Sequence, residues 1–207
     1  MPQTAEPLYL FDFDHTLYAY DFRKRLPALA ELGGSTEYHL AKTWWVAGYE
    51  LRAENGEWPT AEEYLDQFAE VTGARLTLSE WTKARRASST AIPGSIAALA
   101  AAAECGRVAV LSNNPSVFAA ALPELAPDVV GIVGENVLVS ACLGVRKPQA
   151  LAFESALEHY RTRPADAFFV DDNRANVEGS ERVGISGCWF QGDTDDLRRR
   201  VEAFAER

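Results

Sequence analysis

Two aspartates follow an apolar run near the start of the sequence. The run Leu8–Phe11 predicts a buried strand, and the residues Asp-Phe-Asp-His-Thr come directly after it, at positions 12–16. Residues two apart in a strand face the same side, so Asp12 and Asp14 point to one spot if the extended geometry persists. Two like charges there raise the free energy unless a cation or a shared proton compensates them. One carboxylate could attack a substrate while the other transfers a proton; an ordinary acidic turn is the alternative.

Further polar residues follow later apolar runs of the sequence. One group follows the strand predicted at Val108–Leu111, a lysine precedes a predicted helix, and an acidic pair follows the strand predicted at Ala167–Val170. Taken singly, these are a helix cap, a solvated lysine and an acidic turn. In an open α/β sheet, however, the carboxyl ends of the strands share one edge, where ligands bind. The candidate residues at that edge are Ser112, Asn113, Lys147, Asp171 and Asp172.

Strands and helices alternate along the second half of the sequence. This order predicts an α/β fold, with a doubly wound, Rossmann-like parallel sheet and helices on both faces. The predicted later strands are Val108–Leu111, Val129–Val133, Ala167–Val170 and Gly187–Phe190. The predicted helices are Ser95–Glu104, Pro115–Ala121, Pro148–Tyr160, Ala175–Val183 and Thr194–Ala205.

A helical, aromatic-rich block separates the first strand from the rest of this pattern. Helical spacing is visible over residues 36–54, Thr60–Val71 and Ser79–Ala87, and Thr60 with Glu63 has the pattern of a capping box. We expect a small α-helical cap domain of residues 18–90 inserted after the first strand. The catalytic core would consist of residues 1–17 and 91–207, with Gly94 as a position that absorbs hinge rotation.

Composition limits the classes of partner. The formal net charge is −10, which argues against nucleic acid and anionic membranes as partners. No apolar run reaches membrane-spanning length, and the first residues lack the order of a signal peptide. The three cysteines have no metal-binding spacing, which is typical of free thiols in a reducing compartment. We therefore expect a cytoplasmic monomer or homodimer that acts on a small molecule.

Four motifs together resemble those of the haloacid dehalogenase superfamily of hydrolases, in the branch with a helical cap after the first strand. They lie at residues 12–17, 111–113, 144–148 and 169–179, in the order and spacing of that family. The resemblance implies a phosphatase that hydrolyses a small phosphomonoester, a sugar phosphate or a nucleotide, through an aspartyl-phosphate. It implies that Asp12 is the nucleophile and that Asp14 protonates the leaving oxygen and then activates water.

The resemblance also implies how phosphate and metal are held. Ser112, the backbone of Asn113, and Lys147 would bind the phosphoryl oxygens. Mg²⁺ would be bound by the Asp12 carboxylate, the backbone carbonyl of Asp14 and Asp172, with Asp171 binding directly or through water. Oxygen ligands of this kind are those that Mg²⁺ prefers. The Asp14 carboxyl group would then be free to carry a proton.

Other activities remain open on the same core. A 2-haloacid dehalogenase uses an aspartate nucleophile without metal, but that branch lacks the equivalents of Asp14, Asp171 and Asp172. A phosphomutase or a catalytically idle phosphate-binding protein would keep the same fold. The residues expected to select the substrate are His15, Tyr18, Trp44 and Trp45, although aromatic side chains at helical spacing are usually core packing.

Overall fold

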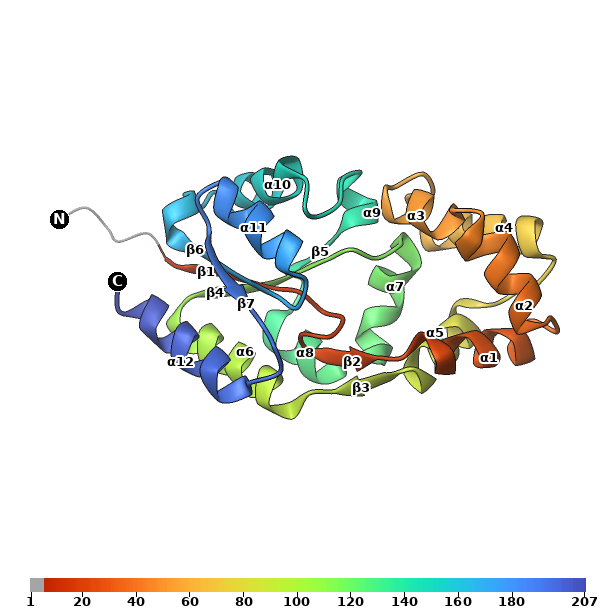
Figure 1. The fold of residues 1–207 in the computed structure, drawn as a ribbon, viewed down its shortest axis with the longest axis horizontal. Coiled ribbons are helices and arrows are strands. Elements are labelled where there is room, and N and C mark those ends of the chain that lie inside the picture. Colours follow the sequence, from red (N-terminus) through yellow and green to blue (C-terminus); the bar gives the residue numbers. More distant parts are fainter. Residues whose placement is uncertain (1–5) are drawn as a thin grey trace.

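The structure is a computed structural model that describes residues 6–207, so the first five residues of the predicted core range lie outside it. Its centre is a sheet of five parallel strands in the order β5-β4-β1-β6-β7 (Figure 1). The strands are β1 Leu8–Phe11, β4 Arg107–Ser112, β5 Val137–Val139, β6 Ala167–Asp171 and β7 Ser186–Trp189. The first strand is thus central, as required if the residues after it are to meet those after β4 and β6. The predicted fold class is confirmed.

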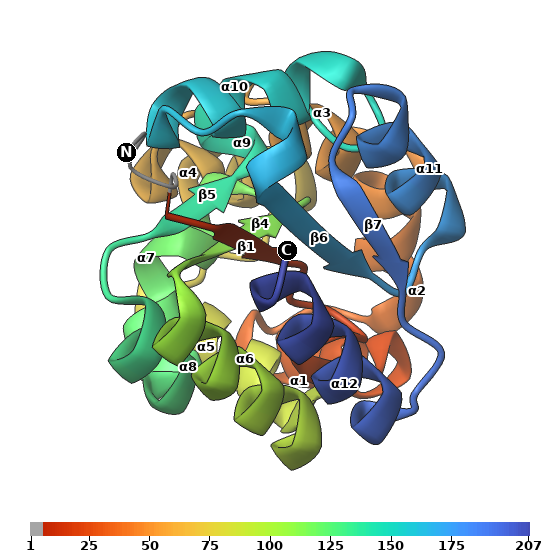
Figure 2. The ribbon, with the colours of Figure 1, turned by 90° about the vertical axis from the view of Figure 1, so that its left-hand side faces the viewer.

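Helices cover both faces of the sheet (Figure 2). Side chains alternate along β1, so that Leu8 and Leu10 pack in one apolar cluster and Tyr9 and Phe11 in the other. The helices α6 Pro93–Cys105 and α12 Thr194–Ala205 lie on one face, and α10 Ala150–Tyr160 and α11 Arg174–Arg182 lie on the other.

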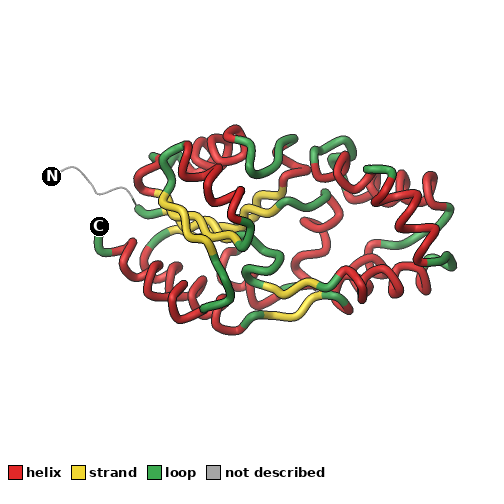
Figure 3. Tube along the Cα trace, in the orientation of Figure 1, coloured by secondary structure: helices red, strands yellow, loops and turns green. Residues whose placement is uncertain are grey.

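A helical insert lies between β1 and α6; we define it as residues 18–91, one residue more than the predicted cap of residues 18–90. Its strands β2 Tyr18–Tyr20 and β3 Ser89–Ala91 pair antiparallel and form the ribbon that joins it to the sheet (Figure 3). Its helices are α1 Phe22–Leu32, α2 Glu37–Leu40, a π-helix at Ala41–Val46, α3 Tyr49–Glu54, α4 Ala61–Thr72 and α5 Leu78–Ala87. The predicted capping box of Thr60 and Glu63 starts α4, and Gly73 ends it in a left-handed conformation.

The helical stripe predicted over residues 36–54 is interrupted. Gly48, at φ 83°, separates the π-helix from α3. A left-handed residue cannot continue a helix, so the chain changes direction there although the apolar spacing continues.

One predicted strand is wrong. The run Val129–Val133 belongs to a helix, α8 Pro127–Val133, and the edge strand next to β4 is β5. A short apolar run suits a buried strand or a buried helix turn equally, and Pro127 at the start with Asp128 in the first turn favours the helix.

No single helix within residues 6–207 has the length and composition to cross a bilayer. The pair of α8 and the preceding α7, Ser116–Leu125, meets that test jointly but is bent by 101°.

Gly94 does not lie in a free joining segment, in contrast to the expectation of a hinge there. It lies in the first turn of α6, where an added Cβ would be 2.4 Å from Oγ1 of Thr194 at the start of α12. Its small size therefore allows two core helices to approach closely. The remaining short elements are α9 Ser140–Leu143 and a 3₁₀ turn at Pro164–Asp166.

Candidate active site

Lys147 lies between two aspartates at the carboxyl end of the sheet. The parallel register pairs Phe11 with Val170, so the residues that follow, Asp12 and Asp171, are neighbours across the two strands. The Nζ atom of Lys147 is 2.7 Å from Oδ1 of Asp12 and 2.7 Å from Oδ2 of Asp171. It also donates to the carbonyl oxygen of Leu111 at 2.7 Å. All three charged side chains are buried.

The segment that carries Lys147 is fixed by two contacts that the sequence did not predict. The Asn113 side chain accepts from the backbone N–H of Lys147 at 3.0 Å and donates to its carbonyl at 2.9 Å. Gly179 on α11 lies so close to this segment that a Cβ there would be 2.7 Å from the carbonyl oxygen of Pro148. The Asn113 side chain therefore fixes the backbone at Lys147. The resemblance had implied a role for the backbone of Asn113 only.

Asp12, Asp171 and Asp172 could together hold a metal ion, because each has a carboxylate oxygen within 4.8 Å of the others. The Asp171 carboxylate is already bonded on both oxygens. Oδ1 accepts from the N–H of Asn173 at 2.8 Å, and Oδ2 accepts from Nδ2 of Asn176 at 2.9 Å as well as from Lys147.

The electrostatics of the group fit a cation. Burial raises the pKa of Asp12 well above its usual range, and the charge of Asp171 adds to this, while Lys147 lowers it. Burial also raises the pKa of Asp172, again with a contribution from Asp171. Burial alone would lower the pKa of Lys147, but the two aspartates outweigh it and raise that pKa. Three carboxyl groups thus lie around one ammonium group, and the donors are oxygens, the ligand type that hard divalent cations prefer.

The Asp14 carboxylate is held by two side-chain donors. It accepts from Nη2 of Arg85 at 2.6 Å and from Nδ2 of Asn114 at 3.0 Å. Arg85 comes from α5 of the insert, is 1% exposed, and lies over the ring of Tyr20 at 4.1 Å. Asn114 also donates to Oγ of Ser112 at 2.9 Å. Arg85 had no distinctive sequence signal, because a basic residue in the last turn of a helix is commonplace.

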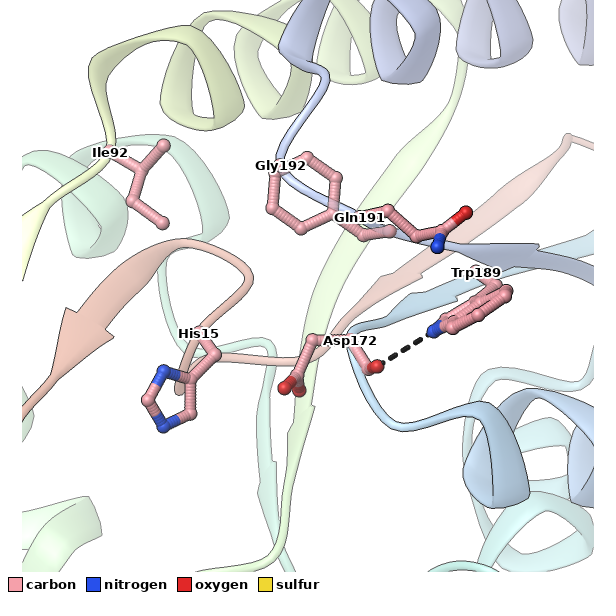
Figure 4. Close-up of a pocket in the computed structure, with 7 residues that line it drawn as sticks. His15, Ile92, Asp172, Trp189, Gln191 and Gly192 are labelled. Carbon is pink, nitrogen blue, oxygen red and sulfur yellow. Dashed lines mark hydrogen bonds between the residues drawn. The ribbon is translucent and has the colours of Figure 1, made fainter.

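Two cavities adjoin these residues. One has a volume of about 240 Å³ between the sheet edge and the insert, and we call it the insert chamber. Its wall consists of Asp14, Asn113 and Asn114 from the core, and Tyr20, Phe22, Arg25, Trp45, Glu50, Glu54 and Arg85 from the insert. The other cavity, about 520 Å³, adjoins Asp172 and the segment after β7 (Figure 4). There Nε1 of Trp189 donates to the carbonyl oxygen of Asp172 at 2.9 Å.

Of the four residues expected to select the substrate, two line cavities and two are buried. His15, at φ 61°, is exposed and lines the cavity at Asp172, and Trp45 lines the insert chamber. Tyr18 is buried, stacks on Phe13, and donates to Oδ1 of Asp128 at 2.6 Å. Trp44 is fully buried inside the insert. The structure thus brings His15 and Trp45 to cavities and places Tyr18 and Trp44 in packing positions.

Comparison with known proteins decides the family. The model of the haloacid dehalogenase-like hydrolase family matches residues 7–184. The chain belongs to this hydrolase family. A glyceraldehyde 3-phosphate phosphatase of Pyrococcus furiosus is 30% identical to this family member over 74 residues. That match covers 35% of the chain and only 31% of the relative, so it spans less than a third of the relative's length.

Solved structures of the family share the fold along nearly the whole chain. A predicted HAD-like hydrolase from Porphyromonas gingivalis superposes with a TM-score of 0.77 at 18% identity, covering 99% of this chain and 100% of that one. A HAD family enzyme from Bacteroides thetaiotaomicron, in complex with magnesium and inorganic phosphate, gives a TM-score of 0.74 at 20% identity. It covers 91% of this chain and 96% of that one. At these identities the likeness establishes the fold.

Proposed function

We propose that this hydrolase is a Mg²⁺-dependent phosphatase that hydrolyses a small phosphomonoester through an aspartyl-phosphate. The observation that carries the proposal is the buried group of Asp12, Asp171 and Asp172, with Lys147 bonded to the first two. A metal-independent attack on carbon would gain nothing from an acidic group that has more negative charge than Lys147 compensates. The phosphatase name of the Pyrococcus furiosus relative and the phosphate bound to the Bacteroides thetaiotaomicron enzyme support the same class of substrate.

The chain's own residues supply nucleophile, proton transfer and charge. In the proposed reaction, a carboxylate oxygen of Asp12 bonds to phosphorus while the ester P–O bond breaks, and the leaving oxygen takes a proton from Asp14. Water then attacks the phosphorus and gives a proton to Asp14. The bond between phosphorus and Asp12 breaks, which releases inorganic phosphate. Lys147, Ser112 and the Asn113 N–H stabilise the phosphoryl oxygens, because phosphoryl transfer depends mainly on positioning and charge neutralisation.

Asp12, the backbone carbonyl of Asp14 and Asp172 would hold Mg²⁺, which neutralises phosphoryl charge when bound. Asp171 would act on the ion through water, because both of its oxygens already accept hydrogen bonds from the protein. Asp14 can transfer a proton only after its pair with Arg85 has opened, so arrival of the substrate must displace Arg85. We also propose that residues 18–90 act as a cap on a core of residues 1–17 and 91–207.

Hydrolysis of p-nitrophenyl phosphate with and without Mg²⁺ tests this function. We expect phosphate release with Mg²⁺ and its loss in EDTA, restored by added Mg²⁺. Full activity of metal-free protein would contradict the proposal. Chloride release from a 2-haloacid without phosphate release would instead show the dehalogenase activity. Transfer of phosphate between two positions of a sugar, without release, would show a mutase.

A further inference from the structure

Asn114 bridges two residues of the proposed reaction that come from different strands. Its Nδ2 atom donates to Oδ2 of Asp14, after β1, at 3.0 Å and to Oγ of Ser112, at the end of β4, at 2.9 Å. The side chain of Asn114 is 5% exposed, so water competes little for either bond. An amide nitrogen carries two hydrogens, and these two bonds use both of them. Asn114 is therefore a neutral link between the proposed proton donor and a proposed ligand of the phosphoryl group.

The core holds the backbone of Asn114 in place. Its carbonyl oxygen accepts from the N–H of Ala141 and from Oγ of Ser140, both at 3.3 Å, and both residues belong to α9. Pro115 follows directly, and a proline disfavours the helical conformation for the residue before it. The amide group of Asn114 thus extends on a short side chain from a fixed backbone, so its neighbours are oriented before any substrate arrives.

The contact of Asn114 with Asp14 differs in kind from that of Arg85. Arg85 is charged and belongs to the insert, and its pair with Asp14 must open before a proton is transferred. Asn114 is neutral and belongs to the core. Its N–H can donate to Oδ2 whether or not the Asp14 carboxyl group is protonated, which leaves Oδ1 to carry the proton. Asn114 can therefore keep Asp14 in one orientation through both proton transfers.

The same amide orients the hydroxyl of Ser112. The Asp14 carboxylate accepts hydrogen bonds, so the nitrogen rather than the oxygen of the Asn114 amide must face it, and this fixes which way the amide lies. The nitrogen then donates to Oγ of Ser112 as well. Because one side of Oγ accepts this bond, the hydrogen of Ser112 points in another direction and is available to a phosphoryl oxygen.

We propose that Asn114 is a positioning residue that aligns Asp14 for proton transfer and Ser112 for donation to the phosphoryl group. This inference rests on the proposed function, because Asp14 and Ser112 have these tasks only in that reaction. The steps of the reaction are unchanged: the proton passes from Asp14 to the leaving oxygen, and later from water to Asp14. Asn114 acts on them only through the two residues that it orients.

Esters with increasingly poor leaving groups test the link to Asp14. p-Nitrophenyl, phenyl and benzyl phosphate are similar in size, but p-nitrophenolate leaves without a proton whereas benzyl alcohol must receive one. With Mg²⁺, Asn114→Ala should lower kcat/KM at least about a hundredfold for benzyl phosphate and less than about tenfold for p-nitrophenyl phosphate, because a misplaced proton donor costs roughly this much. Equal losses for all three esters would overturn the inference.

Asn55→Ala is the matched control for this series. Asn55 is an exposed asparagine of the insert whose side chain donates to the carbonyl oxygen of Leu51. Its kcat/KM should equal that of wild type for each ester.

A double-mutant cycle shows whether Asn114 acts through Asp14. In wild type, Asn114→Ala should lower the ratio of kcat/KM for phenyl phosphate to that for p-nitrophenyl phosphate about tenfold. In Asp14→Asn the proton donor is absent, so the same substitution should lower this ratio less than about threefold. A fall of equal size in both backgrounds would overturn the inference, because Asn114 would then act independently of Asp14.

Inhibition by inorganic phosphate tests the link to Ser112. This ion has no leaving group, so its inhibition constant in the presence of Mg²⁺ reports how well the phosphoryl oxygens are held. Asn114→Ala should raise the constant at least about threefold, as expected for a weakened hydrogen bond. In Ser112→Ala the same substitution should have no further effect. An unchanged constant in folded Asn114→Ala would overturn the inference.

Wild type separates failure of this inference from failure of the proposed function. If it releases phosphate from p-nitrophenyl phosphate only with Mg²⁺, and Asn114→Ala shows uniform losses, the proposed function stands and Asn114 has no positioning role. If wild type releases no phosphate, the proposed function is wrong and the inference falls with it. Thermal melting shows whether each variant folds. Asn114→Ser replaces Asn114→Ala if the latter does not fold, because one hydroxyl hydrogen cannot serve both partners.

Discussion

Lys147 is a residue whose loss should destabilise the fold strongly. It lies between Asp12 and Asp171, and its removal leaves two buried carboxylates side by side. We expect Lys147→Met to lower the free energy of unfolding by about 3–5 kcal/mol, as found when one partner of a buried pair is removed. Urea unfolding measures the change, with the exposed Lys83→Met as control. A loss below about 1 kcal/mol would mean that the two carboxylates share a proton and do not need the ammonium.

Asp12→Asn should remove activity but preserve the fold. Turnover should fall by roughly four orders of magnitude or more, because the nucleophile is lost. The fold should persist with an equal or higher melting temperature in metal-free buffer, since burial and Asp171 already disfavour the charged form. The increase of melting temperature with Mg²⁺ should shrink. Near wild-type turnover would show that another residue attacks.

At the scale of elements, the π-helix of the insert places two adjacent tryptophans in different surroundings. Trp44 is fully buried against Tyr64 and Phe68 and donates to Glu50, whereas Trp45 lines the insert chamber. Trp44→Ala should therefore cost about 3–5 kcal/mol of stability. Trp45→Ala should mainly lower kcat/KM for the best ester and leave p-nitrophenyl phosphate almost unchanged. Equal losses of stability in both variants, measured by thermal melting, would contradict this division.

The elements that the sequence predicted well are those with a strong local signal. Residues 8–11 and 194–205 form the predicted strand and helix at the predicted bounds. The placement of Asp12 and Asp171 at one sheet edge agrees with the expectation, because each follows a predicted strand. The pair of Asp14 with Arg85 could not be predicted, because it joins residues 71 apart through the way the insert packs. The helix at Val129–Val133 was missed because a short apolar run is compatible with a strand or a helix, and the helix-start signal of Pro127 and Asp128 was overlooked.

At the scale of the whole molecule, Glu54 links insert and core through Arg146 and makes stability depend on pH. Burial raises the pKa of Glu54 to about 7 from the usual 4.5; Arg146 and Arg25 lower it, and Glu50 and Asp14 raise it. The folded state therefore holds this proton more tightly than the unfolded chain. Stability due to Glu54 is highest below pH 4.5 and falls as pH rises towards 7.

Glu54→Gln removes this dependence. Between pH 5 and pH 8, the variant should gain on the order of 1–3 kcal/mol of unfolding free energy relative to wild type. Urea unfolding at pH 5 and pH 8 gives the difference in unfolding free energy between variant and wild type at each pH. Subtracting one difference from the other removes the contributions of the other titrating groups. A difference near zero would indicate that Arg146 keeps Glu54 ionised at both pH values.

The central position of β1 affects how the chain folds. Leu8 pairs with Arg107 and with Ala167, so β1 is synthesised before its partners, which follow about 100 and 160 residues later. Closing such loops is slow for a flexible chain. The ribbon of β2 and β3 shortens the first loop, because the N–H of Ile92 bonds to the carbonyl of Leu17. An insert that folds early would bring β1 to β4 and limit the time in which its apolar edges can aggregate.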